Sequence, residues 1–151
     1  MITKVFAPLP GIVIPLEDVN DPVFAQKMLG DGIAISPSSG ILTSPIDGEV
    51  TMVTDTLHAI GLKNDMGVEL LIHIGIDTVS LNGEGFESFI SVGQSVNVGT
   101  PLVEFDIELL NKKNIDPTIM IIATNSKEFN TSLKPLKNVP VKVTDVIWEI
   151  K

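Results

Sequence analysis

Short runs rich in Val, Ile and Thr alternate with glycine- and proline-containing turns along the whole chain. This pattern is typical of many brief strands separated by tight turns. It predicts strands over 11–15, 48–53, 68–74, 95–98, 102–105, 119–123, 139–143 and 146–150. The chain is therefore expected to be all-β, with helices few and short.

Two short helical turns are expected to interrupt the strands. Asp21 is a good N-cap residue, and Pro22 suits the first helical position because its missing N–H needs no partner there. This pair predicts a helix over 23–29. Asp106 is expected to cap a second turn that runs to about Lys113.

Two pairs of segments repeat along the chain. Residues 7–11 (Ala-Pro-Leu-Pro-Gly) resemble 44–48 (Ser-Pro-Ile-Asp-Gly), 37 positions later, and 96–105 resembles 141–150, 45 positions later. The two repeats predict an internal duplication, in which two similar β units pack as an antiparallel β-sandwich or flattened barrel. The alternative is that both are common turn and strand spellings. No composition shift divides the chain, so we expect one domain over 1–151.

Composition and charge narrow the classes of function. The chain has 151 residues and no cysteine, which excludes disulfides, thiolate metal sites and cysteine nucleophiles. Its ten cationic side chains are all Lys, against 19 Asp and Glu, giving a formal net charge of -9. Such a chain is a poor partner for nucleic acid or for an anionic membrane, since both are bound mainly through cations.

The apolar content is high, with a mean hydropathy of +0.35. No apolar run approaches the roughly 18 residues that a membrane span needs, so no direct membrane insertion is expected. The first residues have neither the apolar core nor the cleavage site of a secretory signal. We therefore expect a cytoplasmic protein.

The two histidines of the chain, His58 and His73, are its candidates for chemistry. Strand alternation over 68–74 places the even-numbered apolar residues in the core and His73 on the opposite face. Thr56 and His58 would share one face of an extended segment, so the hydroxyl could reach the ring and set its tautomer. A histidine on a strand is also commonly a half-buried spacer, and the spacing alone does not bring the two rings together.

The segment after His73 is rich in glycine. Residues 73–86 read His-Ile-Gly-Ile-Asp-Thr-Val-Ser-Leu-Asn-Gly-Glu-Gly-Phe, and this run closely resembles the active-site segment of the glucose-type IIA proteins of the bacterial phosphoenolpyruvate-dependent sugar phosphotransferase system. Other segments that resemble the family occur in the same order as in the family, at 7–11, 21–35, 44–48, 58–59, 67–69 and 93–105. The resemblance covers essentially the whole chain and implies a β-sandwich built on a duplicated hybrid motif.

The resemblance also places five residues in the site and implies a role for four of them. His73 would accept a phosphoryl group on Nε2 from the carrier protein HPr and pass it to the IIB domain of a sugar permease. His58 would lie beside it and stabilise the phosphorylated ring, and Thr56 would orient His58. The Gly75 carbonyl would accept the Nδ1 proton of His73. Asp77 matches a carboxylate at the rim of the site, with no part assigned.

Four apolar residues, Val23, Phe24, Leu71 and Val79, match the surface on which partners of the family dock. Ordinary core packing is the alternative interpretation of these side chains. No cofactor is required by this function, although zinc could bind at His58 and His73, adventitiously or with further ligands from a partner.

Two other classes of protein remain as alternatives. The spacing His73-x-x-x-Asp77 is half of a zinc-peptidase motif, and His58 could be a third ligand of a zinc hydrolase. An extended strand would separate residues 73 and 77 by about 13 Å, so one metal could join them only if Gly75 turns the chain. Residues 92–102 resemble a turn of biotin or lipoate carriers, but the adjacent Lys-Met pair of this chain, 27–28, lies in the expected helix.

Overall fold

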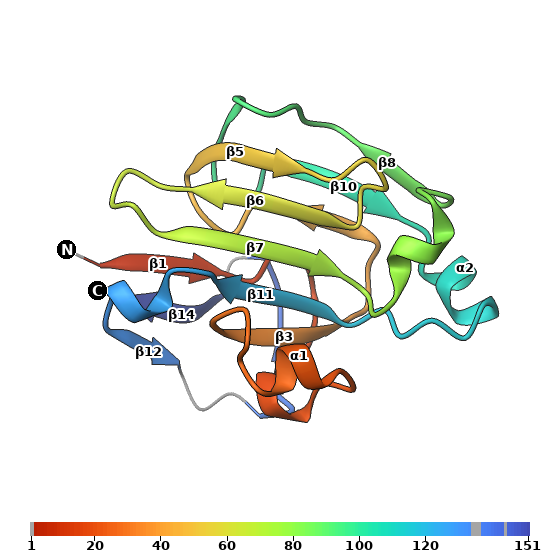
Figure 1. The fold of residues 1–151 in the computed structure, drawn as a ribbon, viewed down its shortest axis with the longest axis horizontal. Coiled ribbons are helices and arrows are strands. Elements are labelled where there is room, and N and C mark those ends of the chain that lie inside the picture. Colours follow the sequence, from red (N-terminus) through yellow and green to blue (C-terminus); the bar gives the residue numbers. More distant parts are fainter. Residues whose placement is uncertain (1, 134–136, 144) are drawn as a thin grey trace.

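Short antiparallel strands are the main regular elements of the structure, a computed structural model that describes residues 2–133, 137–143 and 145–151 (Figure 1). The strands are β1 (Thr3–Phe6), β2 (Gly11–Pro15), β3 (Asp31–Pro37), β4 (Ile41–Thr43), β5 (Gly48–Val53), β6 (Ala59–Lys63), β7 (Glu69–Ile74), β8 (Phe86–Ser88), β9 (Ser95–Val96), β10 (Pro101–Phe105), β11 (Ile119–Ala123), β12 (Thr131–Leu133), β13 (Pro140–Val141) and β14 (Val146–Ile150). The helical turns are η1 (Leu16–Asp18), α1 (Pro22–Ala25), η2 (Thr78–Leu81), α2 (Ile107–Lys112) and η3 (Ser126–Glu128).

The strands form one large and two small sheets. The large sheet has the order β13-β2-β3-β11-β7-β6-β5-β9, and the small sheets have the orders β1-β14-β12 and β4-β10-β8. The small sheets pack against one face of the large sheet, with the main apolar core between them. The predicted all-β sandwich is therefore confirmed. The large sheet is open rather than closed, because its described end strands, β13 and β9, pair only inward, so the flattened-barrel variant of the prediction is wrong.

The two segments of the first predicted repeat form equivalent hydrogen bonds to each other. The Phe6 N–H donates to the Pro45 carbonyl at 2.9 Å, and the Thr43 N–H donates to the Pro8 carbonyl at 2.8 Å. Phe6 and Thr43 are 37 positions apart, as are Pro8 and Pro45. Each turn therefore bonds to the other through an equivalent contact, as expected for two halves related by a pseudo-two-fold axis.

The second repeat also has matching local contacts. The Asn97 N–H donates to Thr100 Oγ1 at 3.0 Å, and 45 positions later the Lys142 N–H donates to Asp145 Oδ2 at 2.9 Å. Position 144 of this repeat lies outside the described residues. In the large sheet, corresponding strands of the two halves lie at equal distances from the centre of the sheet. Thus β13 corresponds to β9, β2 to β5, β3 to β6 and β11 to β7. The predicted internal duplication is confirmed.

The glycines that end the first repeat are required by close packing of the backbone. A Cβ added at Gly11 would lie 2.2 Å from the Ser36 carbonyl oxygen, and one at Gly48 would lie 2.4 Å from the Lys63 carbonyl oxygen. Any side chain would therefore push the neighbouring strand away. Glycine allows β2 and β5 to start directly against β3 and β6.

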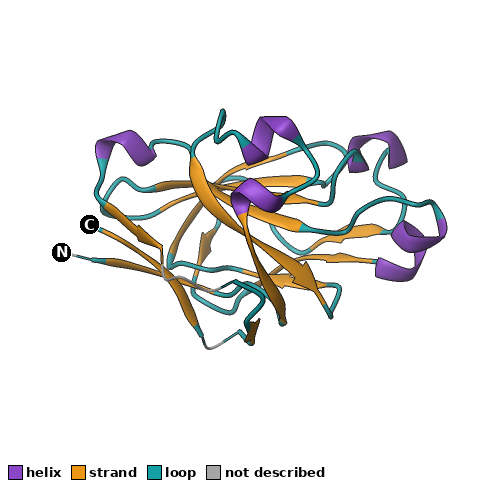
Figure 2. Cartoon of the chain, turned by 90° about the horizontal axis from the view of Figure 1, so that it is seen from below, coloured by secondary structure: helices purple, strands orange, loops and turns teal. Residues whose placement is uncertain are grey.

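The predicted helices are present but one is shorter than expected. The Asp21 carboxylate accepts from the Val23 N–H at 2.9 Å, as predicted for an N-cap, yet α1 ends at Ala25 instead of Leu29. The chain leaves the helix because Lys27 adopts a left-handed conformation, with φ +58°. The helical turns lie along one side and one end of the strands (Figure 2). Among the described residues, no helix is long and apolar enough to cross a membrane.

The two faces of the large sheet are covered differently. Val68, Leu70, Ile72 and Ile74 all lie in the main core, as the alternation over 68–74 predicted. The outer face carries a second, smaller apolar cluster beneath η1 and α1, consisting of Leu16, Val19, Phe24, Ala34, Ile76, Met120 and Ile122. This cluster covers the β3–β11 side of the outer face, and the residues of β7 lie at its border.

Candidate functional site

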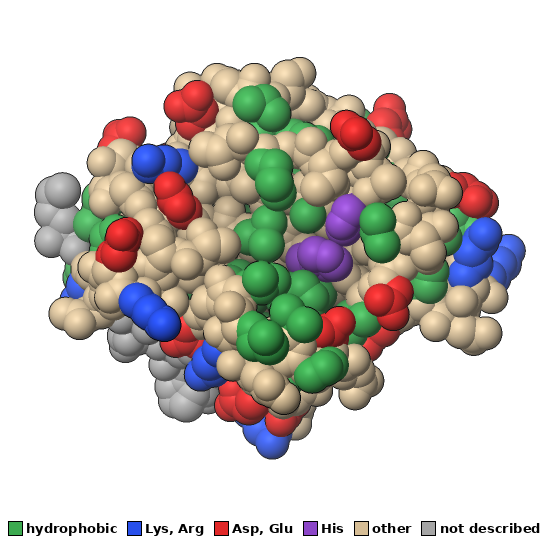
Figure 3. Space-filling view, viewed as in Figure 1, with side chains coloured by type: hydrophobic (Ala, Val, Ile, Leu, Met, Phe, Trp, Pro, Cys, Tyr) green, Lys and Arg blue, Asp and Glu red, His purple; other side chains and the backbone are tan. Residues whose placement is uncertain are grey.

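The two histidines lie side by side on the outer face of the large sheet. His73 is on β7, where it pairs with Ala59 of β6, and His58 immediately precedes β6. The His58 carbonyl accepts from the Ile74 N–H at 2.7 Å, which holds the two segments together. The imidazole centroids are 5.1 Å apart, with the ring planes at 73°. The two rings thus meet edge to face, and both are visible together on the surface in Figure 3.

The tautomer of neutral His73 is determined by a backbone contact. Its Nδ1 lies 2.8 Å from the carbonyl oxygen of Gly75. A carbonyl oxygen can only accept, so Nδ1 carries the proton and Nε2 keeps its lone pair. Gly75 reaches this position through a left-handed turn, with φ +72°.

His58 is oriented by two hydroxyl groups. Thr56 Oγ1 is in close hydrogen-bond contact with His58 Nδ1, and Thr54 Oγ1 lies 3.4 Å from the same nitrogen. The Thr56 contact was predicted, but these residues do not alternate on a strand as that reasoning assumed. They lie in a tight turn between β5 and β6, in which Leu57 has φ +62°. This turn folds the hydroxyl back onto the ring.

The part of Thr54 in orienting His58 was not predicted from the sequence. Its hydroxyl accepts from the Ala59 N–H at 3.1 Å, and its own N–H donates to the Ala59 carbonyl at 3.1 Å. Thr54 therefore closes the turn that presents His58. A hydroxyl residue directly after a predicted strand and four positions before a histidine was the available signal.

The four predicted apolar residues divide into support and surface. The Phe24 ring lies 5.0 Å from the His73 ring, but its side chain is only 6% exposed and belongs to the outer apolar cluster. Leu71 packs against the same cluster and is half-buried. Val23 and Val79 are 39% and 54% exposed. Core packing therefore describes Phe24, whereas Val23 and Val79 offer apolar surface beside the histidines, where Figure 3 shows hydrophobic side chains gathered.

Carboxylates lie near the histidines without pairing with them. Asp77, exposed at the start of η2, and Asp21, the cap of α1, each act on His73 through their charge and raise its pKa. Burial has the larger and opposite effect, so the pKa of His73 lies below its ordinary value of 6.5. Burial also lowers the pKa of His58. Both rings are therefore neutral at pH 7.

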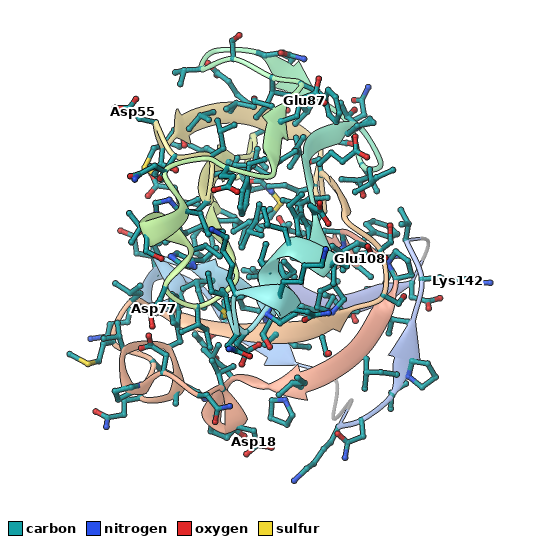
Figure 4. All side chains as sticks on the ribbon, turned by 90° about the vertical axis from the view of Figure 1, so that its right-hand side faces the viewer. Asp18, Asp55, Asp77, Glu87, Glu108 and Lys142 are labelled. Carbon is teal, nitrogen blue, oxygen red and sulfur yellow. The ribbon has the colours of Figure 1, made fainter. Side chains whose placement is uncertain are left out.

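Asp21 was identified from the sequence only as a helix cap, and its charge at the site was not predicted. Asp55 and Asp77 lie toward the left edge of the view in Figure 4, which is the face seen in Figure 3. The site is thus a pair of neutral imidazoles on an apolar floor, with acidic side chains on the surrounding surface.

Two neutral imidazoles that are held in fixed orientations at the surface are suited to accepting a chemical group and transferring it to another molecule. Comparison with known proteins agrees with this interpretation. Residues 3–129 match the family model described as phosphoenolpyruvate-dependent sugar phosphotransferase system, EIIA 1. The chain belongs to this EIIA family. It is 52% identical over 124 residues to the "PTS system glucose-specific EIIA component" of Staphylococcus aureus, covering 82% of this chain and 75% of that protein.

Two further proteins give the same result. The "PTS system glucose-specific EIIA component" of Staphylococcus epidermidis is 48% identical over 125 residues, which cover 83% of this chain and 75% of that protein. The solved structure of glucose permease IIA from Mycoplasma capricolum superposes with a TM-score of 0.88 at 40% identity, covering 100% of this chain and 97% of that one. The EIIA family is a component of a phosphotransferase system, so the predicted family and its fold are confirmed.

The alternative of a zinc hydrolase lacks a ligand set in the described part of this EIIA chain. Gly75 does turn the chain between His73 and Asp77, as that alternative required. However, residues 2–133, 137–143 and 145–151 contain no group of three or more His, Cys, Asp or Glu side chains placed to hold a metal. Zinc bound by His58 and His73 with ligands from a partner stays a prediction.

The alternative of a biotin or lipoate carrier also lacks support. Lys27 lies in the turn between α1 and β3, where its ammonium is 3.4 Å from the Asp31 carboxylate. A carrier lysine is presented at the tip of a hairpin, free to be modified. The Lys-Met pair of this chain is instead part of the segment that covers the outer face of the sheet.

Proposed function

We propose that this EIIA chain is a phosphocarrier that accepts a phosphoryl group from phosphorylated HPr on Nε2 of His73 and transfers it to the IIB domain of a sugar permease. The observation that carries the proposal is the His58–His73 pair, whose ring centroids are 5.1 Å apart, with Nδ1 of His73 bonded to the Gly75 carbonyl. A phosphoryl acceptor needs a nitrogen lone pair that no proton occupies. The Gly75 carbonyl keeps the proton on Nδ1, and so leaves the lone pair on Nε2, without adding charge.

His58 would stabilise the phosphorylated ring. If the Thr56 hydroxyl donates to Nδ1 of His58, the ring proton resides on Nε2, and the ring can donate to a phosphoryl oxygen. The role of Thr56 is then to select this tautomer. Transfer of a phosphoryl group depends mainly on such positioning and on stabilisation of charge.

Additional positive charge would come from the partners. The chain contains no Arg and carries a formal net charge of -9, with Asp21 and Asp77 close enough to His73 to affect its pKa. A partner with a cationic surface around an apolar centre would be attracted to this face and would bring the cations that phosphoryl transfer needs. Val23 and Val79 provide the matching apolar surface.

The sugar is proposed from the relatives. Both Staphylococcus proteins are named glucose-specific, and the superposed structure is a glucose permease IIA. A glucose permease is therefore the first acceptor to test. A relay between HPr and the IIB domain of a permease would take place in the cytoplasm.

The test is phosphoryl labelling of the purified chain with phosphoenolpyruvate, Enzyme I and HPr. The wild-type chain should gain one acid-labile, base-stable phosphoryl group that maps to His73. His73→Ala should take no label while keeping its thermal unfolding transition. Lys142→Ala, which alters an exposed side chain at the opposite edge of the view from Asp77 in Figure 4, is a control that should label normally. Undiminished labelling of His73→Ala would refute the assignment.

A further inference from the structure

The turn that presents the Gly75 carbonyl is held from outside by a three-residue segment, 116–118, that leads into β11. We infer that Asp116 is a positioning residue for His73. Its carboxylate fixes the segment 116–118, the carbonyls of this segment hold the Gly75 turn, and the Gly75 carbonyl fixes the ring. This inference rests on the proposed function and adds to it a residue that does not touch the histidine.

The contacts form a continuous chain from Asp116 to the ring. Asp116 Oδ1 accepts from the Thr118 N–H at 2.9 Å and from the Thr118 hydroxyl at 2.5 Å. The Thr118 carbonyl accepts from the Gly75 N–H at 2.9 Å, and the Asp116 carbonyl accepts from the Ile76 N–H at 2.9 Å. The Gly75 carbonyl, between these two anchored N–H groups, faces His73 Nδ1 at 2.8 Å.

The Asp116 carboxylate acts where the backbone contacts of α2 end. The Ile115 N–H still donates to the Leu110 carbonyl at 2.9 Å, whereas in 116–118, which form no strand or helix, the Asp116 carboxylate accepts from Thr118. Pro117 fixes its own φ but donates no hydrogen bond. Thr118 is buried, and Asp116 accepts from both its N–H and its hydroxyl, so loss of the carboxylate would leave two buried donors without that acceptor. The segment would then rearrange and carry its carbonyls with it.

Loss of the anchors would change the tautomer of His73. If the Gly75 carbonyl turns away, Nδ1–H loses its acceptor and the ring can place its proton on Nε2 instead. That second tautomer has no lone pair on Nε2 and cannot accept a phosphoryl group there. Removing one ordinary hydrogen bond of this kind corresponds to a change of about fivefold in the tautomer ratio.

The experiment compares Asp116→Ala with Asp116→Asn. Asparagine keeps an Oδ1 acceptor for Thr118, so this variant should rescue what alanine loses. The readout is the ratio of the two neutral His73 tautomers from ¹⁵N chemical shifts of the unphosphorylated protein, together with the initial rate of phosphoryl acceptance. We expect Asp116→Ala to raise the ratio of the Nε2–H to the Nδ1–H tautomer about fivefold relative to wild type, and to lower the rate in proportion to the share of the Nδ1–H tautomer that is lost.

Two further variants keep the inference testable. Asp47→Ala is the matched control, because Asp47 Oδ1 also accepts from a backbone N–H, that of Val98 at 2.8 Å, but away from the histidines. Thr118→Val removes only the hydroxyl donor and should shift the tautomer ratio in the same direction by less, which provides a test if Asp116→Ala does not fold.

The outcomes separate the two proposals. A wild-type tautomer ratio in both Asp116→Ala and Thr118→Val, or an equal shift in Asp47→Ala, would overturn the role of Asp116, even if the variants lost stability. A wild-type chain that takes no phosphoryl group would overturn the proposed function. The tautomer comparison would still decide whether Asp116 positions the ring.

Discussion

The replacement of Gly75 by Ala tests whether the turn after β7 is as tightly determined as its contacts indicate. Gly75 has φ +72°, in the left-handed region. An alanine there costs about 1–2 kcal/mol, because its Cβ approaches the following carbonyl oxygen. This cost is the same at any left-handed position and does not depend on the site.

The surroundings of Gly75 add a second cost. A Cβ at this position would lie 2.5 Å from Thr78 Cγ2 and 3.0 Å from the Asp116 carbonyl oxygen. The Thr78 methyl cannot simply rotate away, since the Thr78 hydroxyl donates to the Ile74 carbonyl. Overpacking of this kind costs about 1–3 kcal/mol, so the free energy of unfolding should fall by about 2–5 kcal/mol in total.

Gly67→Ala is the matched control for this variant. Gly67 has φ +84°, and a Cβ there would meet nothing within 4 Å. The free energy of unfolding of Gly67→Ala should fall only by the cost of the left-handed conformation, about 1–2 kcal/mol. The difference of about 1–3 kcal/mol between the two variants corresponds to about 2–12 °C in Tm for a chain of this size.

The measurements are thermal unfolding, followed by far-ultraviolet circular dichroism and by the fluorescence of Trp148, and phosphoryl acceptance from HPr. Trp148 is the sole tryptophan and is fully buried, so its emission reports on the core. Gly75→Ala should be the less stable variant and the slower acceptor, whereas Gly67→Ala should accept at the wild-type rate. Equal Tm values, or full acceptance by Gly75→Ala, would refute the reasoning from the turn geometry.

Four further predictions concern the ring pair and the docking surface. His58→Gln should still accept a phosphoryl group but transfer it slowly to IIB, and normal sugar phosphorylation by this variant would remove His58 from the relay. Because burial lowers the pKa of His73 below 6.5, acceptance should decline at acid pH with a midpoint below 6.5. An acid limb centred above 6.5 in the rate profile would contradict this. Asp21→Asn removes a charge that raises this pKa and should move the limb to lower pH. Val79→Lys should weaken partner binding in a titration while changing the free energy of unfolding by less than about 0.5 kcal/mol. Val92→Lys, at a 62% exposed position between β8 and β9, should leave binding unchanged, and equal losses in both variants would argue against a docking surface at Val79.

Strands with clear turn residues at both ends were predictable from the sequence. Ranges 11–15, 48–53, 119–123 and 146–150 match β2, β5, β11 and β14 at both ends, since each is a β-branched run bounded by turn residues. The predicted strands 95–98 and 139–143 shorten to two residues each in β9 and β13. These lie at the edges of the large sheet, where a strand has a partner on one side only.

Six strands were not predicted, namely β1, β3, β4, β6, β8 and β12. β6 shows why. Its sequence, Ala-Ile-Gly-Leu-Lys, has a glycine at its centre and is buried on both faces, so it has no alternation to detect. Gly61 is instead required by its neighbours, because a Cβ there would lie 2.7 Å from Thr51 Oγ1 on β5. Such a requirement is imposed by the partner strand and cannot be found in the segment itself.

The site was predictable only in part, for the same reason. The outward direction of His73 follows from alternation. The contact of Thr56 with His58 was predicted, but a tight turn makes it and not the strand alternation on which the prediction relied. The distance between the two rings depends on the register of β6 against β7, which no local pattern determines, and the family resemblance supplied it. The effects of Asp21 and Asp116 on His73 cross between segments far apart in the chain, so only the structure places them there.

The location of the site follows from a difference between two otherwise equivalent halves. In one half, β2 and β3 are joined by residues 16–30, which fold into η1 and α1 and cover the outer face of β3 and β11. In the other half, the corresponding strands β5 and β6 are joined by residues 54–58 alone. This short turn is too small to cover its side of the sheet, so it leaves His73 half-buried and places His58 beside it. Phe24, at the border of the longer cover, completes the floor under the ring. The duplicated fold thus gives a rigid sheet, and the unequal lengths of two connections turn one half of it into a site.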